Sequence, residues 1–124
     1  MIPRILIVDD ERDIIDSLKV GLARRGFEVD VTDDPREAID RFAPKKYDIV
    51  FLDMKMPTMD GFELYKEIKA KDMNARVVFL TAFEINPDTI SKVLPDISVK
   101  DFVHKPVSIS KLVDFIREQI CDRR

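Results

Sequence analysis

Five short apolar runs, spread along the whole chain, constrain the fold more than any other feature of the sequence. They lie at residues 5–8, 27–31, 49–52, 77–80 and 102–103. The three runs of four residues, at 5–8, 49–52 and 77–80, are apolar throughout, which is typical of parallel strands covered on both faces of a sheet. Longer segments with helical spacing separate the runs. Strands and helices are therefore predicted to alternate.

Helix signals occupy the segments between these runs. Ile14, Leu18 and Leu22 recur at intervals of four residues, and Gly26 stands where that helix would end. Asp34 and Pro35 are typical of a helix start. A third helix is expected after Gly61 and the last one after the cap Ser108, while a fourth, between Pro87 and Pro95, should be short. The predicted fold is an α/β three-layer αβα sandwich with a five-stranded parallel sheet.

Charge and cysteine content argue against several classes of function. The 124 residues include 21 Lys and Arg and 24 Asp and Glu, a net charge of −3, so neither tight nucleic-acid binding nor binding to an anionic membrane is indicated. No apolar run approaches the ~20 residues that cross a bilayer. Cys121 is the only cysteine, and the chain starts without a signal peptide. We expect one cytoplasmic domain, residues 1–124, with no output domain in this chain.

Acidic, hydroxyl and basic residues follow the predicted strands. Asp9 and Asp10 follow the first strand, Asp53 the third, Thr81 and Ala82 the fourth, and Lys105 the fifth. Ligands of open parallel sheets bind at these carboxyl ends. If the first and third strands are neighbours, the three aspartates converge, and each like-charge pair at ~4 Å costs about 4 kcal/mol at an effective dielectric of 20. A compensating cation is therefore expected.

The residue types indicate which cation and which ligand would fit. Carboxylates without nearby His or Cys suit Mg²⁺. Lys105 and the Thr81 hydroxyl suit phosphoryl oxygens, and Asp53 is the candidate acceptor because a carboxylate can form an aspartyl phosphate. Taken singly, each residue has a plainer interpretation: Asp9 and Asp10 as helix cap and dipole partners, and the Thr or Lys as structural. The combination favours a phosphoryl site.

The sequence resembles the receiver domains of two-component response regulators over essentially its whole length. The matching motifs are residues 5–11 (ILIVDDE), 52–57 (LDMKMP) with Asp60 and Gly61 behind them, 80–82 (LTA) and 104–106 (HKP). The resemblance implies the strand order 2-1-3-4-5 of that flavodoxin-like fold.

The resemblance also implies a role for each site residue. Asp53 would receive the phosphoryl group from a phosphohistidine of a histidine kinase or phosphotransfer protein, with Mg²⁺, or Mn²⁺ in its place, in the site. Asp10 would bind the metal directly, Asp9 through water, and Asp53 and the backbone carbonyl of Lys55 would complete the protein ligands. Lys105 would pair with Asp53 beforehand and then hold the phosphoryl group. The domain would catalyse its own phosphorylation and dephosphorylation.

Thr81 and Phe102 are the implied switch. Thr81 would bond the phosphoryl group, small Ala82 would leave its path open, and Phe102 would move inward, or else serve as a plain core aromatic. The surface of the fourth helix, fifth strand and fifth helix would then change shape for a downstream protein target, an output domain or a homodimer. The prolines between Thr81 and Lys105 depart from the family pattern. Bulky Lys55 and Phe83 are expected to hinder a hydrolytic water and so prolong the phosphoryl state.

Three alternatives differ from this interpretation in class. A phosphatase with an Asp-x-Asp nucleophile needs an acid at the position of Lys55. A flavodoxin-like flavin carrier needs a phosphate-binding loop after the first strand, where Asp9, Asp10 and Glu11 would repel phosphate. A degenerate receiver that binds partners without phosphorylation is disfavoured because the five residues of the phosphoryl site are all present. These residues are Asp9, Asp10, Asp53, Thr81 and Lys105.

Overall fold

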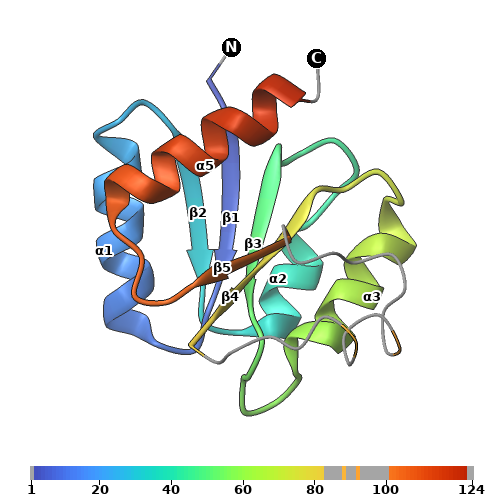
Figure 1. Cartoon of the computed structure of the whole chain (residues 1–124). Coiled ribbons are helices and arrows are strands. Elements are labelled where there is room, and N and C mark those ends of the chain that lie inside the picture. Colours follow the sequence, from blue (N-terminus) through green and yellow to red (C-terminus); the bar gives the residue numbers. More distant parts are fainter. Residues whose placement is uncertain (1, 83–87, 89–91, 93–100, 123–124) are drawn as a thin grey trace.

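The computed structural model describes residues 2–82, 88, 92 and 101–122, and within them five parallel strands form one sheet (Figure 1). The strands are β1 (Arg4–Val8), β2 (Glu28–Thr32), β3 (Ile49–Asp53), β4 (Val77–Thr81) and β5 (Phe102–His104). Their order is β2-β1-β3-β4-β5, which confirms the predicted topology. The second to fifth strands each end one residue beyond the predicted run, at Thr32, Asp53, Thr81 and His104.

The described helices are α1 (Arg12–Ala23), α2 (Pro35–Arg41), α3 (Gly61–Lys71) and α5 (Ile109–Asp122). They differ in how they begin, because α2, α3 and α5 each follow a residue whose side chain accepts a hydrogen bond from a first-turn N–H group and α1 does not. Asp34 caps α2 by accepting a hydrogen bond from the Arg36 N–H, and the Ser108 hydroxyl accepts one from the Lys111 N–H at the start of α5. Both predicted caps are confirmed. The first helix ends at Ala23, before the expected Gly26, and Gly26 follows it with a positive φ of 93°.

Alternate residues of each strand point to opposite faces of the sheet, and each face is covered by helices. Leu6 of β1 and Val50 of β3 pack in one core with α2 and α3, whereas Ile5 and Phe51 pack in a second core with α1 and α5. The sheet lies between these helix pairs as the middle layer (Figure 1). The uninterrupted apolar runs are thus explained by burial on both faces.

The core-facing side of the first helix is centred one residue away from the predicted spacing of Ile14, Leu18 and Leu22. Ile15, not Ile14, is fully buried together with Leu18 and Leu22, because positions three and seven residues apart share a helix face. Ile14 is partly buried at the edge of that core.

The predicted fourth helix, apart from Asp88 and Lys92, lies outside the described residues, as do both of its flanking prolines and Phe83. Among the described residues, no helix combines the length and the apolar character that a membrane span needs.

Candidate functional site

The strands that carry the candidate residues end at one edge of the sheet. Asp9 directly follows β1, and Asp53 ends the neighbouring β3, where it lies opposite Leu80 of β4. Thr81 ends β4, and its carbonyl oxygen accepts a hydrogen bond from the backbone N–H of Lys105 at 2.7 Å. Parallel pairing therefore brings together residues that are up to 96 positions apart, from 9 to 105.

Three carboxylates form the centre of the site. Asp9, Asp10 and Asp53 each offer an oxygen, and these atoms lie within 4.8 Å of one another. Asp9 is fully buried, and its Oδ2 receives no hydrogen bond from the described residues apart from its ion pair with Lys105. A buried carboxylate oxygen with so few partners, beside two further carboxylates, fits the all-oxygen donor set of Mg²⁺.

Lys105 is the positive charge beside these carboxylates. Its Nζ lies 2.5 Å from Asp9 Oδ2, 3.3 Å from Glu11 Oε1 and 3.6 Å from Asp53 Oδ1. The expected pair with Asp53 is present, but Asp9 lies closer. The Lys105-Pro106 peptide bond is cis.

The environment shifts the proton affinities of the two central groups. Burial, followed by the negative charge of Asp9, raises the pKa of Asp53 from its ordinary 3.8 to about 7, although the charge of Lys105 opposes the shift. Burial alone would lower the pKa of Lys105, but the hydrogen bond and charge of Asp9, with the charge of Asp53, raise it overall. The pKa values of Asp53 and Lys105 are therefore both raised, so each group keeps its proton to a higher pH than it would in water.

The predicted switch residues lie on the α2–α3 face of the sheet. Phe102 is partly buried, and its ring stacks on Phe79 with the centroids 5.2 Å apart and an interplanar angle of 23°. Thr81, two residues after Phe79 on the same strand, is fully buried. Ala82 follows as an exposed residue at the edge of the site.

The loop after Asp53 leads directly into α3. Lys55, two residues past Asp53, is exposed in this loop. Asp60 caps α3 by accepting a hydrogen bond from the Glu63 N–H at 2.8 Å. A Cβ at Gly61 would collide with the backbone carbonyl oxygen of Asp53. Asp60 and Gly61, which the sequence marks as part of the matching motif before the third helix, therefore lie directly behind Asp53 and support it.

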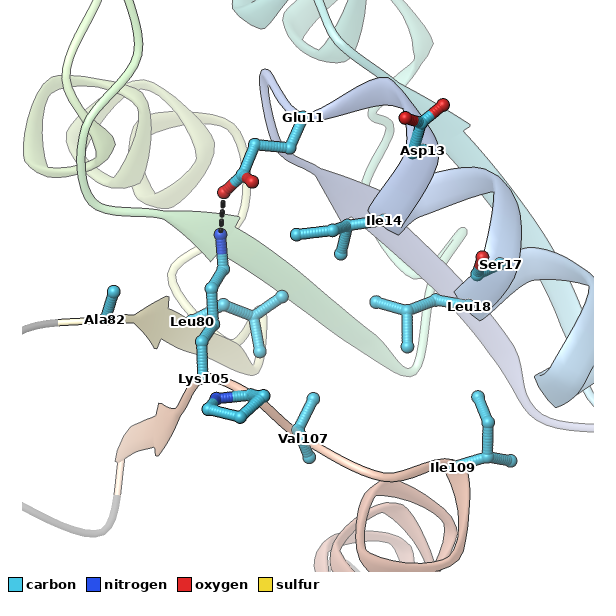
Figure 2. Close-up of a pocket in the computed structure, with 11 residues that line it drawn as sticks. Glu11, Asp13, Ile14, Ser17, Leu18, Leu80, Ala82, Lys105, Val107 and Ile109 are labelled. Carbon is cyan, nitrogen blue, oxygen red and sulfur yellow. Dashed lines mark hydrogen bonds and ion pairs between the residues drawn. The ribbon is translucent and has the colours of Figure 1, made fainter.

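Glu11 has a contact in the site that its place in the sequence does not reveal. Its side chain reaches from the start of α1 to Lys105, as Figure 2 shows. Below this pair lies a cavity of about 610 Å³. The apolar part of its lining is Ile14, Leu18, Leu80, Ala82, Pro106, Val107 and Ile109. The only sequence-level indication of the Glu11 contact was its position next to the aspartate pair.

Comparison with known proteins gives one consistent family. The sequence profile of the response regulator receiver domain matches residues 5–117. Response regulator MprA of Mycolicibacterium vanbaalenii is 32% identical over 114 residues, which cover 92% of this chain and 48% of that protein. The chain spans about half the length of the first curated relatives it matches.

Solved structures agree with the sequence comparison. The non-phosphorylated receiver domain of HemR from Leptospira biflexa has a TM-score of 0.80 and 27% identity, and the match covers 95% of this chain and 94% of that one. The response regulator TrrA from Thermotoga maritima, solved in complex with Mg²⁺–BeF, has a TM-score of 0.74 and 32% identity, with coverage of 95% and 99%.

Proposed function

The chain belongs to the family of response regulator receiver domains, and from that premise we propose that it accepts a phosphoryl group on Asp53 and signals through the resulting change of shape. The donor is a phosphohistidine of a histidine kinase or phosphotransfer protein. An Asp53 oxygen forms a bond to phosphorus while the bond from phosphorus to the donor imidazole breaks, and the imidazole leaves with that electron pair.

The residues around Asp53 supply position and charge for this transfer. Lys105, 3.6 Å from Asp53 Oδ1, holds a phosphoryl oxygen once Asp53 is modified. The Thr81 hydroxyl donates a hydrogen bond to another phosphoryl oxygen. Ala82 at the site's edge leaves the approach open because its side chain is small. On this account the domain catalyses its own phosphorylation and dephosphorylation.

We assign the metal site to Asp9, Asp10 and Asp53, with the backbone carbonyl of Lys55 as a further ligand. Bound Mg²⁺ neutralises charge on the phosphoryl oxygens and on the carboxylates. The fit rests on the clustered carboxylate oxygens, one of which, the buried Asp9 Oδ2, has Lys105 as its one partner among the described residues. Mg²⁺ should raise the Tm of the unmodified chain and have little effect on the Tm of the Asp10→Asn variant, because that variant loses a ligand. An equal rise in both chains would contradict the assignment.

The change of shape is proposed to pass from Thr81 to Phe102 by packing. Thr81 and Phe79 point to the same face of β4, and the Phe79 ring lies on that of Phe102. Movement of Thr81 toward a phosphoryl group frees space behind it, and Phe102 moves inward to fill that space. Phosphorylation thereby shifts the population of a pre-existing conformation.

The partners follow from the same proposal. A histidine kinase or phosphotransfer protein supplies the phosphoryl group, and a downstream protein or an output domain responds to it. Phosphorylation also provides a route to a homodimer. The curated relatives are about twice as long as this chain, so their whole-protein activities are not transferred to it. We place the domain in the cytoplasm, where a single cysteine, Cys121, stays reduced.

The observation that carries the proposal is the convergence of three carboxylates and Lys105 from separate strand ends. The test is incubation with Mg²⁺ and acetyl phosphate, followed by the mass of the intact protein. One added phosphoryl group is expected in the unmodified chain and in Asp40→Ala, an exposed control on α2, and none in Asp53→Ala or with EDTA. A degenerate receiver would gain no phosphoryl group in any of these samples.

A further inference from the structure

Glu11 occupies the N-cap position of α1 but does not cap the helix. Its backbone is extended, with φ −86° and ψ 94°, and its side chain makes no capping hydrogen bond. Glutamate is not among the preferred N-cap residues, which are Ser, Thr, Asp and Asn. The Glu11 side chain instead lies 3.3 Å from Lys105 Nζ. Glu11 therefore does not stabilise the start of α1 through its side chain, which reaches Lys105 in the phosphoryl site instead.

The contact joins two loops at the edge of the site. Glu11 comes from the loop between β1 and α1, and Lys105 from the loop between β5 and α5, and the two side chains meet above the cavity (Figure 2). The backbone N–H of Glu11 also donates to Asp9 Oδ1 at 3.0 Å. Glu11 therefore contacts both members of the tight Asp9–Lys105 pair.

Glu11 differs from the other carboxylates around Lys105 in its exposure and its place. Its side chain is 56% exposed, whereas those of Asp9 and Asp53 are 0% and 12% exposed. It is also outside the group whose oxygens could share a metal ion. It can hold Lys105 without taking part in binding a cation or in accepting phosphorus.

We propose that Glu11 is a positioning residue that holds the Lys105 ammonium group on the Asp9 side of the pocket, so that Lys105 reaches a phosphoryl group on Asp53 only by releasing Glu11. This inference rests on the proposed function, in which Lys105 holds the phosphoryl group, and adds that Glu11 restrains Lys105 beforehand. In the unmodified state, Asp9 and Glu11 lie closer to the ammonium group than Asp53 does. Lys105 must break its contact with Glu11 during phosphorylation, and this requirement slows the reaction.

The test compares two variants of Glu11 with a neighbouring carboxylate. Glu11→Gln keeps the shape and removes the charge, while Glu11→Asp keeps the charge, shortens the reach and favours capping of α1. Asp13→Asn is the matched control, because Asp13 is an exposed carboxylate on the same cavity rim. With Mg²⁺ and acetyl phosphate, both Glu11 variants should react about two- to five-fold faster, a range set by the small worth of exposed ion pairs. Asp13→Asn should react at the unmodified rate.

A second readout needs no phosphoryl donor. In ¹⁵N spectra of lysine ammonium groups, the Lys105 signal should shift in both Glu11 variants and stay in place in Asp13→Asn. Unmodified rates in both Glu11 variants, with uptake still abolished in Asp53→Ala, would overturn this inference and leave the proposed function intact. Equal acceleration in Glu11→Gln and Asp13→Asn would mean that the loss of any negative charge on the cavity rim speeds phosphorylation. That result would also overturn the inference. Absence of uptake in the unmodified chain would overturn both.

Discussion

Replacing Asp53 with asparagine should stabilise the metal-free protein, and increasingly so at higher pH. The pKa of Asp53 is raised from 3.8 to about 7, first by burial and then by Asp9, so between these values the folded chain keeps a proton that the unfolded chain releases. The stability that this proton contributes is fully present below pH 3.8 and is lost as pH rises through about 7. Asparagine stays neutral and avoids this loss.

The size of the effect follows from the pKa shift. Each pKa unit corresponds to about 1.36 kcal/mol, and the slope flattens as pH approaches the raised pKa of about 7, so the range from about pH 5 to about pH 7 amounts to roughly 2 kcal/mol. The difference in free energy of unfolding between Asp53→Asn and the unmodified chain should therefore widen by about that amount over this range.

The assay is urea unfolding followed by circular dichroism at pH 5, 6, 7 and 8, with EDTA present. Asp40→Asn, on the exposed face of α2, is the control and should show a small difference that does not change with pH. If the difference for Asp53→Asn stays constant or narrows as pH rises, the reasoning is refuted. Burial and the charge of Asp9 would then not destabilise the folded protein when Asp53 is ionised.

Three further substitutions test other parts of the account. Gly61→Ala should lower the free energy of unfolding by about 1–3 kcal/mol and slow phosphorylation, because its Cβ would displace the Asp53 backbone; urea unfolding and phosphoryl uptake measure these effects. Arg76→Ala should cost about 1–3 kcal/mol in urea unfolding, because it removes the mostly buried ion pair with Asp101 and a 2.6 Å hydrogen bond to α5. Lys55→Asn should shorten the lifetime of the phosphorylated protein, because a smaller side chain obstructs water less; the decay of the phosphorylated mass measures it.

The substitutions of Arg76 and Lys55 each have a matched control at an exposed residue. Arg117→Ala on α5 and Lys66→Asn on α3 remove similar side chains away from the contacts in question. Unchanged stability in Gly61→Ala would mean that the backbone of Asp53 yields without cost. If Arg117→Ala lowers the free energy of unfolding as much as Arg76→Ala does, the ion pair between Arg76 and Asp101 is not the cause of the loss. An unchanged or slower decay in Lys55→Asn would contradict the shielding role of Lys55.

The fold could be predicted because local patterns and burial agree along the chain. Strands covered on both faces leave apolar runs without polar interruption, and the runs at 49–52 and 77–80 fall inside β3 and β4. The caps Asp34 and Ser108 act on N–H groups two or three residues away, so sequence alone reveals them. Convergence of Asp9, Asp10 and Asp53 followed from the strand order together with their positions at strand ends.

The contacts that sequence could not predict depend on tertiary distances. Two adjacent isoleucines both fit the first helix, and only packing against the sheet decides that Ile15 is buried. The preference of Lys105 for Asp9 over Asp53 depends on about 1 Å, from 2.5 to 3.6 Å, that no spacing rule fixes. The same holds for the reach of Glu11 to Lys105 across 94 positions.

Chemical mapping of the phosphorylated residue tests the central claim most directly. Borohydride reduces an aspartyl phosphate to homoserine, so treatment after incubation with Mg²⁺ and acetyl phosphate marks the acceptor for peptide mass spectrometry. We expect homoserine at position 53 and at no other aspartate, and none when EDTA is present. Homoserine at Asp9 or Asp10, or none at all in a protein that binds Mg²⁺, would contradict Asp53 as the phosphoryl acceptor.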